Sequence, residues 1–373
     1  MRIIVDNHIP NIQGLIEPRA EVLYLEPGDI TRDVVRDADA LVVRTRTRCD
    51  AALLDGSRVR FIGSATIGTD HIDLDYCASR GITVRNAPGC NAPAVAQWVF
   101  CAIVAWMRSC DISSPDGLTL GVVGVGHIGS IVARWGKALG FTVLLNDPPR
   151  EMAEKTDRTD RTDRTEKTDG TEKTEKTDVT EMTDVTDGME SAVDGGFLPL
   201  EELQRCCDII TVHTPLTRGG QWPTWHLFDQ AFLDGLAHCR LILDAARGAI
   251  ADNEALLGWT GDVALDCWEN EPNISRELLE KAIVATPHIA GYSAEGKQRG
   301  TAMMLEALNE FYHWDIPVPT IASPATGAAQ VTLAGIAASY DILADTAALK
   351  ATPAAFESLR NHYAHRQEYL ERD

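Results

Sequence analysis

The stretch from Leu118 to Asp147 constrains the fold more than any other part of the chain. It reads LTLGVVGVGHIGSIVARWGKALGFTVLLND: an apolar run leads through a glycine-rich turn into an amphipathic segment and a second apolar run. Gly124, Gly126 and Gly129 give the pattern G-x-G-x-x-G at the turn. These glycines permit a tight turn, close approach of a pyrophosphate and close packing of helix on strand, so the pattern predicts a dinucleotide site. A glycine-rich packing turn without a ligand is the alternative.

Asp147 closes the second apolar run, 18 residues after Gly129. An acid at this distance accepts hydrogen bonds from the adenosine ribose, and it would repel the 2′-phosphate of NADP. The helix that begins near Ile128 adds unpaired N–H groups and the positive end of its dipole for the phosphates. We therefore predict NAD as the cofactor.

Length and composition indicate a globular protein. The 373 residues are enough for about two or three domains with cores of their own. No apolar run is long enough to span a bilayer and the N-terminus lacks a secretory signal, so we expect a cytoplasmic protein without a membrane partner. The net charge of −21 argues against a nucleic-acid partner. The nine cysteines are scattered and never spaced C-x-x-C, which favours reduced thiols and no metal site.

Residues 151–190 differ from the rest of the chain. Threonine recurs at every third position from Thr156 to Thr186, and the segment holds 14 acidic and 7 basic residues with few apolar ones. A period of three fits neither a strand nor an α-helix, and such a segment buries too little surface to offset its ordering entropy. We predict a disordered insertion in the nucleotide-binding part of the chain. A cation-binding tract and a phosphorylation target are the alternatives.

Strand-like and helix-like segments alternate on both sides of the glycine motif, which predicts parallel sheets. Before the motif, apolar runs predict strands at 3–5, 38–44, 59–63 and 82–84 and a long buried helix over 92–107. After it, strands are expected at 208–213, 240–245, 263–266 and 283–286, then a helix over 294–314 and an amphipathic helix near 353–369. The carboxyl ends of parallel strands share one edge of a sheet, where ligands bind.

Three polar side chains follow the later strands. Arg247 stands on a turn of small residues, Glu271 precedes a proline and His288 follows one. An arginine holds a carboxylate through two parallel hydrogen bonds. Beside a nicotinamide, a histidine can take the proton of an alcohol while a glutamate orients the imidazole. Purely structural hydrogen bonds are the alternative.

The sequence resembles the D-2-hydroxyacid dehydrogenase family, whose members carry an A-x-R-G turn, then an acidic segment ending in E-P, then a P-H segment, all after the glycine motif. The matching segments here are Ala245-Ala246-Arg247-Gly248, Asp266-Cys267-Trp268-Glu269-Asn270-Glu271-Pro272 and Thr286-Pro287-His288-Ile289-Ala290-Gly291. The resemblance covers nearly the whole chain except 151–190. It implies that Arg247, Glu271 and His288 are the catalytic residues.

The resemblance also implies an α/β fold with three parts. We place a smaller flavodoxin-like α/β substrate domain at 1–92 and 290–316, a Rossmann-type NAD-binding domain at 93–289 and a C-terminal dimerisation domain at 317–373. We accordingly expect a homodimer.

Roles carry over from the family by position. The expected cofactor contacts, besides the glycine motif and Asp147, are His127, Ile128, Thr214, Ala246, Asp266 and Gly291. The expected substrate contacts are Thr45, Thr66 and Tyr292. Arg44, next to Thr45, is a candidate for binding a substrate phosphate, with an ordinary surface arginine as the alternative.

The substrate that we expect is a small phosphorylated 2-hydroxy acid. Two other functions stay open at this point. One is a dehydrogenase for another acid, such as 3-phosphoglycerate or glycerate/hydroxypyruvate. The other is an NAD-responsive binding protein without catalytic activity, because a shared fold does not fix the function.

Overall fold

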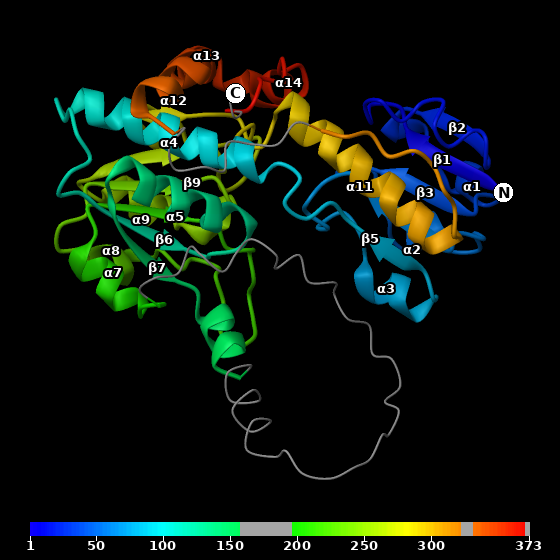
Figure 1. The fold of residues 1–373 in the computed structure, drawn as a ribbon, viewed down its shortest axis with the longest axis horizontal. Helices are drawn as coiled ribbons and strands as arrows, with labels where there is room; N and C mark the ends of the chain where they lie inside the picture. The colour runs from blue at the N-terminus through cyan, green and yellow to red at the C-terminus, as the bar shows by residue number, and fades with distance from the viewer. Residues whose placement is uncertain (157–195, 322–330, 370–373) are drawn as a thin grey trace, which may run out of the picture. The chain divides into compact units, whose positions relative to one another are not determined.

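A computed structural model describes residues 1–156, 196–321 and 331–369. The chain divides into two compact units (Figure 1). Unit 1 comprises Met1–Gln97, Ala290–Gln330 and Tyr363–Asp373, and unit 2 comprises Trp98–Ile289 and Val331–His362. The described residues include no helix that is both long and apolar enough to cross a membrane.

Unit 1 is built on a parallel sheet of five strands in the order β2-β1-β3-β4-β5. The strands are β1 (Arg2–Asp6), β2 (Glu21–Leu25), β3 (Ala40–Val43), β4 (Phe61–Ser64) and β5 (Thr83–Arg85). Its helices are α1 (Arg32–Val35), α2 (Ala51–Leu54), α3 (Leu74–Ser79) and α11 (Ala294–Tyr312), with a 3-10 turn η1 (Pro27–Asp29). This strand order is that of flavodoxin, so the predicted flavodoxin-like fold is confirmed.

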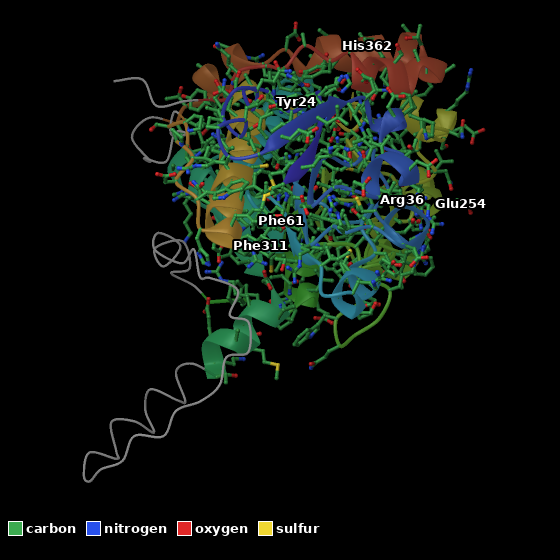
Figure 2. The ribbon with its side chains drawn as sticks, turned by 90° about the vertical axis from the view of Figure 1, so that its right-hand side faces the viewer. Tyr24, Arg36, Phe61, Glu254, Phe311 and His362 are labelled. Carbon is green, nitrogen blue, oxygen red and sulfur yellow. The ribbon has the colours of Figure 1, made fainter. Side chains whose placement is uncertain are left out.

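Helix α11 covers one face of this sheet (Figure 1). The side chain of Ser293 accepts a hydrogen bond from the Gly296 N–H and so caps the start of the helix. Met304, Leu305 and Leu308 lie on one side of α11 and join Phe61 of β4 in an apolar cluster. The ring centroids of Phe61 and Phe311 are 5.1 Å apart (Figure 2). The packing of α11 therefore brings a segment from late in the chain into the core of unit 1.

Unit 2 contains a parallel sheet of six described strands in the order β11-β10-β9-β8-β6-β7. The strands are β6 (Thr119–Val123), β7 (Thr142–Asn146), β8 (Ile209–Val212), β9 (Leu241–Asp244), β10 (Asp262–Leu265) and β11 (Val284–Ala285). The chain runs from β6 outward to β7 and then returns to the other side of β6 with β8. Such a reversal marks the ligand-binding crevice of an open α/β sheet, and it confirms the predicted Rossmann-type fold.

Helices cover the sheet of unit 2 and close its core. The helical segments, in chain order, are α4 (Ala92–Ser109), α5 (His127–Leu139), α7 (Leu200–Cys206), α8 (Gln230–Asp234), η3 (Gly248–Ile250), α9 (Asn253–Gly258), α10 (Arg276–Lys281), α12 (Leu333–Ser339), α13 (Ile342–Ala351), η5 (Pro353–Ala355) and α14 (Phe356–Asn361). The long helix predicted over 92–107 is α4, and its Phe100 lies 5.9 Å from Trp135 of α5 between ring centroids. Helix α5 ends at Gly140, which has a φ of 101°.

The start of the threonine-rich tract differs from the prediction. Residues 148–156 are helical, whereas the sequence predicts disorder from 151 onward. The Asp147 carboxylate accepts a hydrogen bond from the Arg150 N–H, and Arg150 and Lys155 form i,i+4 pairs with Glu154 and Glu151. A cap and two such pairs favour a helix in a polar sequence. The rest of the tract lies outside the described residues.

The end of the chain also differs from the prediction. The amphipathic helix expected near 353–369 is shorter, because η5 and α14 end at Asn361 and the following residues are not helical. Helix α13 packs beside β11, where the Thr346 hydroxyl accepts a hydrogen bond from the Ala285 N–H. Residues 331–362 thus belong to unit 2, and Tyr363 onward belongs to unit 1. The dimerisation role of 317–373 stays a prediction.

Candidate active site

The register of β6, β7 and β8 in unit 2 places the predicted cofactor residues that follow these strands at the same edge of the sheet. Val123 at the end of β6 pairs with Asn146 on β7 and with Val212 on β8. The glycine turn, Asp147 and Thr214 therefore follow neighbouring strands at the same edge of the sheet. A Cβ on Gly129 would lie 2.0 Å from the Gly124 carbonyl oxygen, and one on Gly124 would lie 2.8 Å from the Thr214 side chain. The tight contacts explain why glycine is needed at both positions.

The remaining parts of the turn fit an anionic ligand. Gly126 is exposed and has no heavy atom within 4 Å of the position of a Cβ. His127 and Ile128 form the first turn of α5, which runs for 13 residues and points its unpaired N–H groups toward this space. The Asp147 carboxylate accepts a hydrogen bond of 2.8 Å from the Val125 N–H, which fixes the acid against the glycine turn.

Thr214 carries a buried hydroxyl oxygen without a hydrogen-bond partner in the described residues. The same is true of the second carboxylate oxygen of Asp244, at the end of β9. Buried polar atoms without partners are rare in native proteins, and each calls for a ligand or a water. The residues at this edge of unit 2 therefore fit a polar dinucleotide.

Asp244 and Asp266 are buried side by side at the ends of β9 and β10. The Asp244 carboxylate accepts a hydrogen bond from the Ala246 N–H at 2.8 Å. The Asp266 carboxylate accepts hydrogen bonds from the Thr286 hydroxyl at 2.6 Å and from the Ile289 N–H at 2.7 Å. Burial, together with the charge of Asp266, raises the pKa of Asp244 to about 8. Asp266 thus holds the segment that carries His288 in place.

His288 and Glu271 form a hydrogen-bonded pair. The distance between His288 Nδ1 and Glu271 Oε2 is 2.8 Å, and Glu271 Oε1 accepts a second hydrogen bond, of 2.9 Å, from the Trp268 N–H. His288 has a left-handed backbone with a φ of 57°. Burial alone would raise the pKa of Glu271, but the bond to His288, the Trp268 N–H and the charge of Arg360 lower it below its usual value. Glu271 is therefore an anion beside the imidazole.

Arg247 lies on a turn that packs tightly against the acidic segment. A Cβ on Gly248 would lie 2.0 Å from the Trp268 carbonyl carbon, so only glycine fits at this position. The Arg247 guanidinium donates to the Ala246 carbonyl oxygen at 2.8 Å. The close packing of the two segments brings Arg247 to the cavity that Glu271 and His288 also line.

A cavity of about 360 Å³ in unit 2 joins these groups. It is lined by Leu216, Arg218, Arg247, Gly248, Ala249, Trp268, Glu269, Asn270, Glu271 and His288. All three predicted catalytic residues are thus brought to one cavity, although they lie up to 41 positions apart in the sequence. A basic side chain, a carboxylate and an imidazole around one space can bind a carboxylic acid and move a proton.

The predicted substrate residues belong to unit 1. Thr45 is exposed after β3, and the Thr66 hydroxyl bonds to that of Ser64 at 2.8 Å. Arg44 donates through Nε to the buried Asp6 carboxylate at 3.1 Å. Tyr292 follows Gly291, at which a Cβ would lie 2.0 Å from Asn91 Nδ2. Gly291, which the sequence predicts to contact the cofactor, belongs to unit 1, whereas the other predicted cofactor residues belong to unit 2.

Two residues near the catalytic groups are not predicted from the sequence. Arg218 lines the cavity and lies over the Trp225 ring at 4.9 Å, and the only sequence signal is its place in the polar loop that follows Thr214. Arg360, on α14, lies 3.8 Å from the Glu271 carboxylate. No sequence signal indicates Arg360, because it lies 89 positions after Glu271.

The absence of a resident metal stays a prediction. Among the described residues, Cys267, Glu271 and His288 bring possible metal-binding atoms within 4.8 Å of one another, and so do His226, Asp252 and Glu269. In each group the histidine bonds directly to a glutamate, at 2.8 Å. Burial raises the pKa of the Cys267 thiol, so the thiolate that a metal prefers is disfavoured. Both groups are satisfied as acid–imidazole pairs.

Known proteins resemble this chain in sequence and in fold. Residues 3–319 match the catalytic-domain model of the D-isomer specific 2-hydroxyacid dehydrogenases. The erythronate-4-phosphate dehydrogenase of Bacteroides thetaiotaomicron is 39% identical, covering 99% of this chain and 97% of its own. That of Porphyromonas gingivalis is 37% identical, covering 99% and 94%.

Solved structures share the fold at lower identity. D-mandelate dehydrogenase of Rhodotorula graminis, in its apo form, has a TM-score of 0.65 at 21% identity over 86% of this chain and 97% of its own. NAD⁺-bound 3-phosphoglycerate dehydrogenase of Entamoeba histolytica has a TM-score of 0.62 at 20% identity over 86% and 98%. The family match extends over most of the chain, and the glycine turn, the A-x-R-G turn and the Glu–His pair lie within it. The chain belongs to the D-isomer specific 2-hydroxyacid dehydrogenase family.

Proposed function

We propose that this protein oxidises 4-phospho-D-erythronate at its C2 hydroxyl, with NAD as the acceptor, to give 2-oxo-3-hydroxy-4-phosphobutanoate. The observation that carries the chemistry is the Glu271–His288 pair beside Arg247 in one cavity. The substrate is indicated by the relatives at 37–41% identity, which are erythronate-4-phosphate dehydrogenases. The reaction is a step in the biosynthesis of pyridoxal 5′-phosphate.

His288 is the general base of the proposed reaction. Its Nδ1 faces the Glu271 carboxylate, which accepts and cannot donate, so Nδ1 carries the proton. This leaves Nε2 with a lone pair for the proton of the C2 hydroxyl. Glu271 stabilises the imidazolium that forms, because it is held as an anion next to the ring. In the reverse direction, His288 returns the proton to the carbonyl oxygen.

Arg247 binds the acid end of the substrate. Its planar guanidinium matches a carboxylate through two parallel hydrogen bonds, and the turn at Gly248 keeps it at the cavity. A guanidinium at this position also polarises the oxygen on C2 as the carbonyl forms. Binding and orientation by Arg247 place the C2 hydroxyl within reach of His288.

NAD is held in this proposal by the glycine turn, the start of α5 and Asp147. The other contacts that we predict with NAD are made by the Thr214 hydroxyl, Ala246, Asp266 and Gly291. When bound, NAD supplies the ring carbon that accepts the hydrogen and electron pair from C2. The buried Thr214 hydroxyl and the open space beside Gly126 are the features that fit such a ligand.

The substrate contacts that we propose in unit 1 are Thr45, Thr66, Tyr292 and Arg44. Arg44 forms an ion pair with the buried Asp6 carboxylate, which holds its guanidinium in a fixed orientation. We also propose that the chain forms a homodimer through 317–373, and that it acts in the cytoplasm.

Side-by-side assays of NADH formation test the substrate. The purified protein is given 4-phospho-D-erythronate, 3-phosphoglycerate and glycerate at equal concentrations with NAD. We expect kcat/KM to be highest for 4-phospho-D-erythronate, by about a hundredfold or more, because each missing charged or hydroxyl contact costs about a factor of ten. A higher kcat/KM for either of the other acids would contradict the proposal. Binding of NAD without oxidation of any acid would favour the non-enzymatic alternative.

A further inference from the structure

Arg218 lines the catalytic cavity together with Arg247, but it takes no part in the proposed steps. Its side chain is exposed. In the part of the chain that the structure describes, the Arg218 guanidinium contacts the Trp225 ring and has no carboxylate partner. Arg44 differs in this respect, because it is paired with the buried Asp6. Arg218 therefore brings to the cavity a positive charge that no described carboxylate neutralises.

A stack of side chains holds Arg218 at the cavity. The guanidinium carbon of Arg218 lies 4.9 Å from the centre of the Trp225 ring. The Trp225 ring lies in turn on the His226 ring, with centroids 3.8 Å apart and planes inclined by 13°. His226 Nε2 bonds to Glu269 Oε1 at 2.8 Å, and Glu269 itself lines the cavity. Trp225 is 42% exposed, so the stack rather than burial in the core fixes its ring. Because an indole face attracts a guanidinium, the stack restricts where the charge of Arg218 can lie.

The backbone fixes the loop that carries Arg218. The Trp225 N–H donates to the Thr217 carbonyl oxygen at 2.9 Å, which closes the loop directly beside Arg218. The His226 N–H donates at 2.9 Å to the carbonyl oxygen of Ala249, a residue that also lines the cavity. His226 has a left-handed backbone with a φ of 50°, a conformation that costs free energy in a residue other than glycine. The loop is thus anchored to the wall of the cavity at the position where the stack begins.

The two glutamates of the cavity are bonded to other groups. Glu269 bonds to His226, and its second oxygen accepts from the Asn253 N–H at 3.2 Å. Glu271 bonds to His288 at 2.8 Å. Neither carboxylate lies within ion-pair distance of Arg218. The charge of Arg218 is therefore available to an anion that enters the cavity from solution.

We propose that Arg218 binds the phosphate group of the substrate, and that Trp225 is a positioning residue that holds its guanidinium in place. This rests on the proposed function, in which Arg247 binds the carboxylate at the other end of the same acid. A guanidinium presents parallel N–H donors that match two oxygens of a phosphate, and no other residue type offers this geometry. Two arginines on one cavity would then select an acid with an anionic group at each end.

The first test compares two acids in four proteins. Arg218→Gln removes the charge, and Arg218→Lys keeps it without the paired donors. We expect Arg218→Gln to raise KM for 4-phospho-D-erythronate about tenfold or more, because charge-assisted hydrogen bonds are lost, while KM for NAD and for unphosphorylated D-erythronate stays near the wild-type value. Arg218→Lys should lie between the two.

Arg240→Gln is the matched control. Arg240 is also exposed, and its guanidinium lies 5.0 Å from the centre of the Trp106 ring, but it does not line the cavity. Loss of this arginine should leave KM for both acids unchanged. A rise in KM for the phosphorylated acid that equals that of Arg218→Gln would mean that the net charge of the protein, and not Arg218, sets the affinity, and would overturn the inference.

Trp225 is tested through its coupling to Arg218. Trp225→Leu removes the stack, and we expect it to raise KM for 4-phospho-D-erythronate by a smaller factor, about threefold. The double variant Arg218→Gln/Trp225→Leu should have no higher KM than Arg218→Gln alone, because Trp225 acts only through Arg218. Additive losses that also appear on D-erythronate would show that Trp225 supports the fold and does not position Arg218.

Three results of the first test would overturn the assignment of Arg218. One is an unchanged KM for 4-phospho-D-erythronate in Arg218→Gln. Another is an equal loss on the two acids, since the phosphate would then not be the group that is bound. The third is a rise in KM for NAD alone, which would assign Arg218 to the pyrophosphate of the cofactor.

A second test measures binding of inorganic phosphate by calorimetry, with NAD present in excess so that the dinucleotide site is filled. Weaker binding to Arg218→Gln than to the wild type and to Arg240→Gln supports the site whichever acid the enzyme oxidises. Equal binding to all three proteins, or no binding to the wild type, contradicts it. Failure of the proposed function is seen separately, as wild-type protein that does not oxidise 4-phospho-D-erythronate.

Discussion

Glu271 shows how one side chain is set for its task by its neighbours. It is partly buried, which would favour the neutral acid, yet the His288 bond, the Trp268 N–H and Arg360 hold it as a carboxylate. We expect Glu271→Gln to lower kcat by about a hundredfold to ten-thousandfold with little change in KM for NAD, since the amide has one acceptor oxygen for two N–H donors and no charge to stabilise the imidazolium.

The matched control for this variant is Glu254→Gln. Glu254 is an exposed carboxylate on α9 and is labelled in Figure 2. It should keep wild-type kcat and the wild-type melting temperature. Steady-state NADH formation measures both variants. A Glu271→Gln enzyme with near-normal kcat would remove the carboxylate from the mechanism.

Asp244 predicts a pH dependence of stability. Burial raises its pKa from 3.8 in an ordinary aspartate to about 8, so between these values the folded protein holds a proton that the unfolded chain has released. Asp244 therefore makes the free energy of unfolding fall as pH rises through this window, by up to about 1.4 kcal/mol per pH unit. Asn at this position stays neutral and still accepts from the Ala246 N–H.

Asp244→Asn should accordingly match the wild type near pH 4 and become progressively more stable than it up to about pH 8. Urea unfolding at a series of pH values measures the difference. A constant difference between the two proteins across this range would show that Asp244 does not change its protonation on folding.

The sequence predicts the site residues that directly follow strands, but it does not indicate the site residues that lie on distant segments of the chain. Arg247, Glu271 and His288 each follow a strand of one parallel sheet, so their strand ends alone place them at one edge. Arg360 reaches Glu271 from α14, and His365 reaches Tyr292 from the last segment of the chain. Those contacts depend on how distant segments pack, for which a single sequence has no pattern. The roles of all these residues stay predictions.

At the scale of elements, the turn at Gly248 is the tightest junction of the site. A Cβ there would lie 2.0 Å from the Trp268 carbonyl carbon, so the turn and the acidic segment would have to separate. We expect Gly248→Ala to lower kcat/KM by about a hundredfold and the melting temperature by several degrees, because Arg247 would move away from Glu271 and His288 and the packing would be strained.

Gly258→Ala is the control for this substitution. Gly258 is the last residue of α9, and nothing lies within 4 Å of its Cβ position. Alanine there should leave kcat/KM unchanged and keep or raise the melting temperature, since it reduces the freedom of the unfolded chain. If both variants behave alike, the contact with Trp268 does not set the geometry of the site.

Elements with a strong apolar pattern were predictable, and elements fixed by polar contacts were not. The long helix over 92–107 and the helix over 294–314 match α4 and α11 closely. The edge strand β2 is not among the predicted strands, although residues 22–25 are four apolar residues in a row; its side chains are exposed or half-buried in the structure. The helix at 148–156 depends on an Asp147 cap and two ion pairs, which are polar contacts without an apolar pattern in the sequence.

At the scale of the whole molecule, the dimer that we propose has a testable surface. Leu343 on α13 lies in the segment predicted to dimerise, and 51% of its surface is exposed in the single chain. A partner that covers this leucine removes apolar surface from water, which stabilises the dimer. We expect sedimentation to show a dimer for the wild type and a shift toward monomer for Leu343→Glu.

Leu257→Glu serves as the comparison, because Leu257 is 38% exposed on α9, outside the predicted dimerisation segment. It should leave the dimer intact at the same protein concentration. A wild-type chain that sediments as a monomer at micromolar concentration would contradict the dimer. A dimer that survives Leu343→Glu would place the interface elsewhere.

The family and the fold of both units could be predicted from the sequence, and both are confirmed. The division of the C-terminal segment between the units could not. Residues 331–362 belong to unit 2 and Tyr363 onward to unit 1, a split that follows from the contacts of Thr346 and Arg366 rather than from any change in composition.

The proposed reaction is direct transfer of the C2 hydrogen of 4-phospho-D-erythronate to NAD, with His288 taking the hydroxyl proton. It is tested by incubating the enzyme with the acid deuterated at C2 and analysing the cofactor by mass spectrometry. We expect the NADH formed to carry the deuterium, and His288→Gln to form almost no NADH while still binding NAD. Unlabelled NADH, or labelled NADH formed at the wild-type rate by the His288→Gln variant, would contradict it.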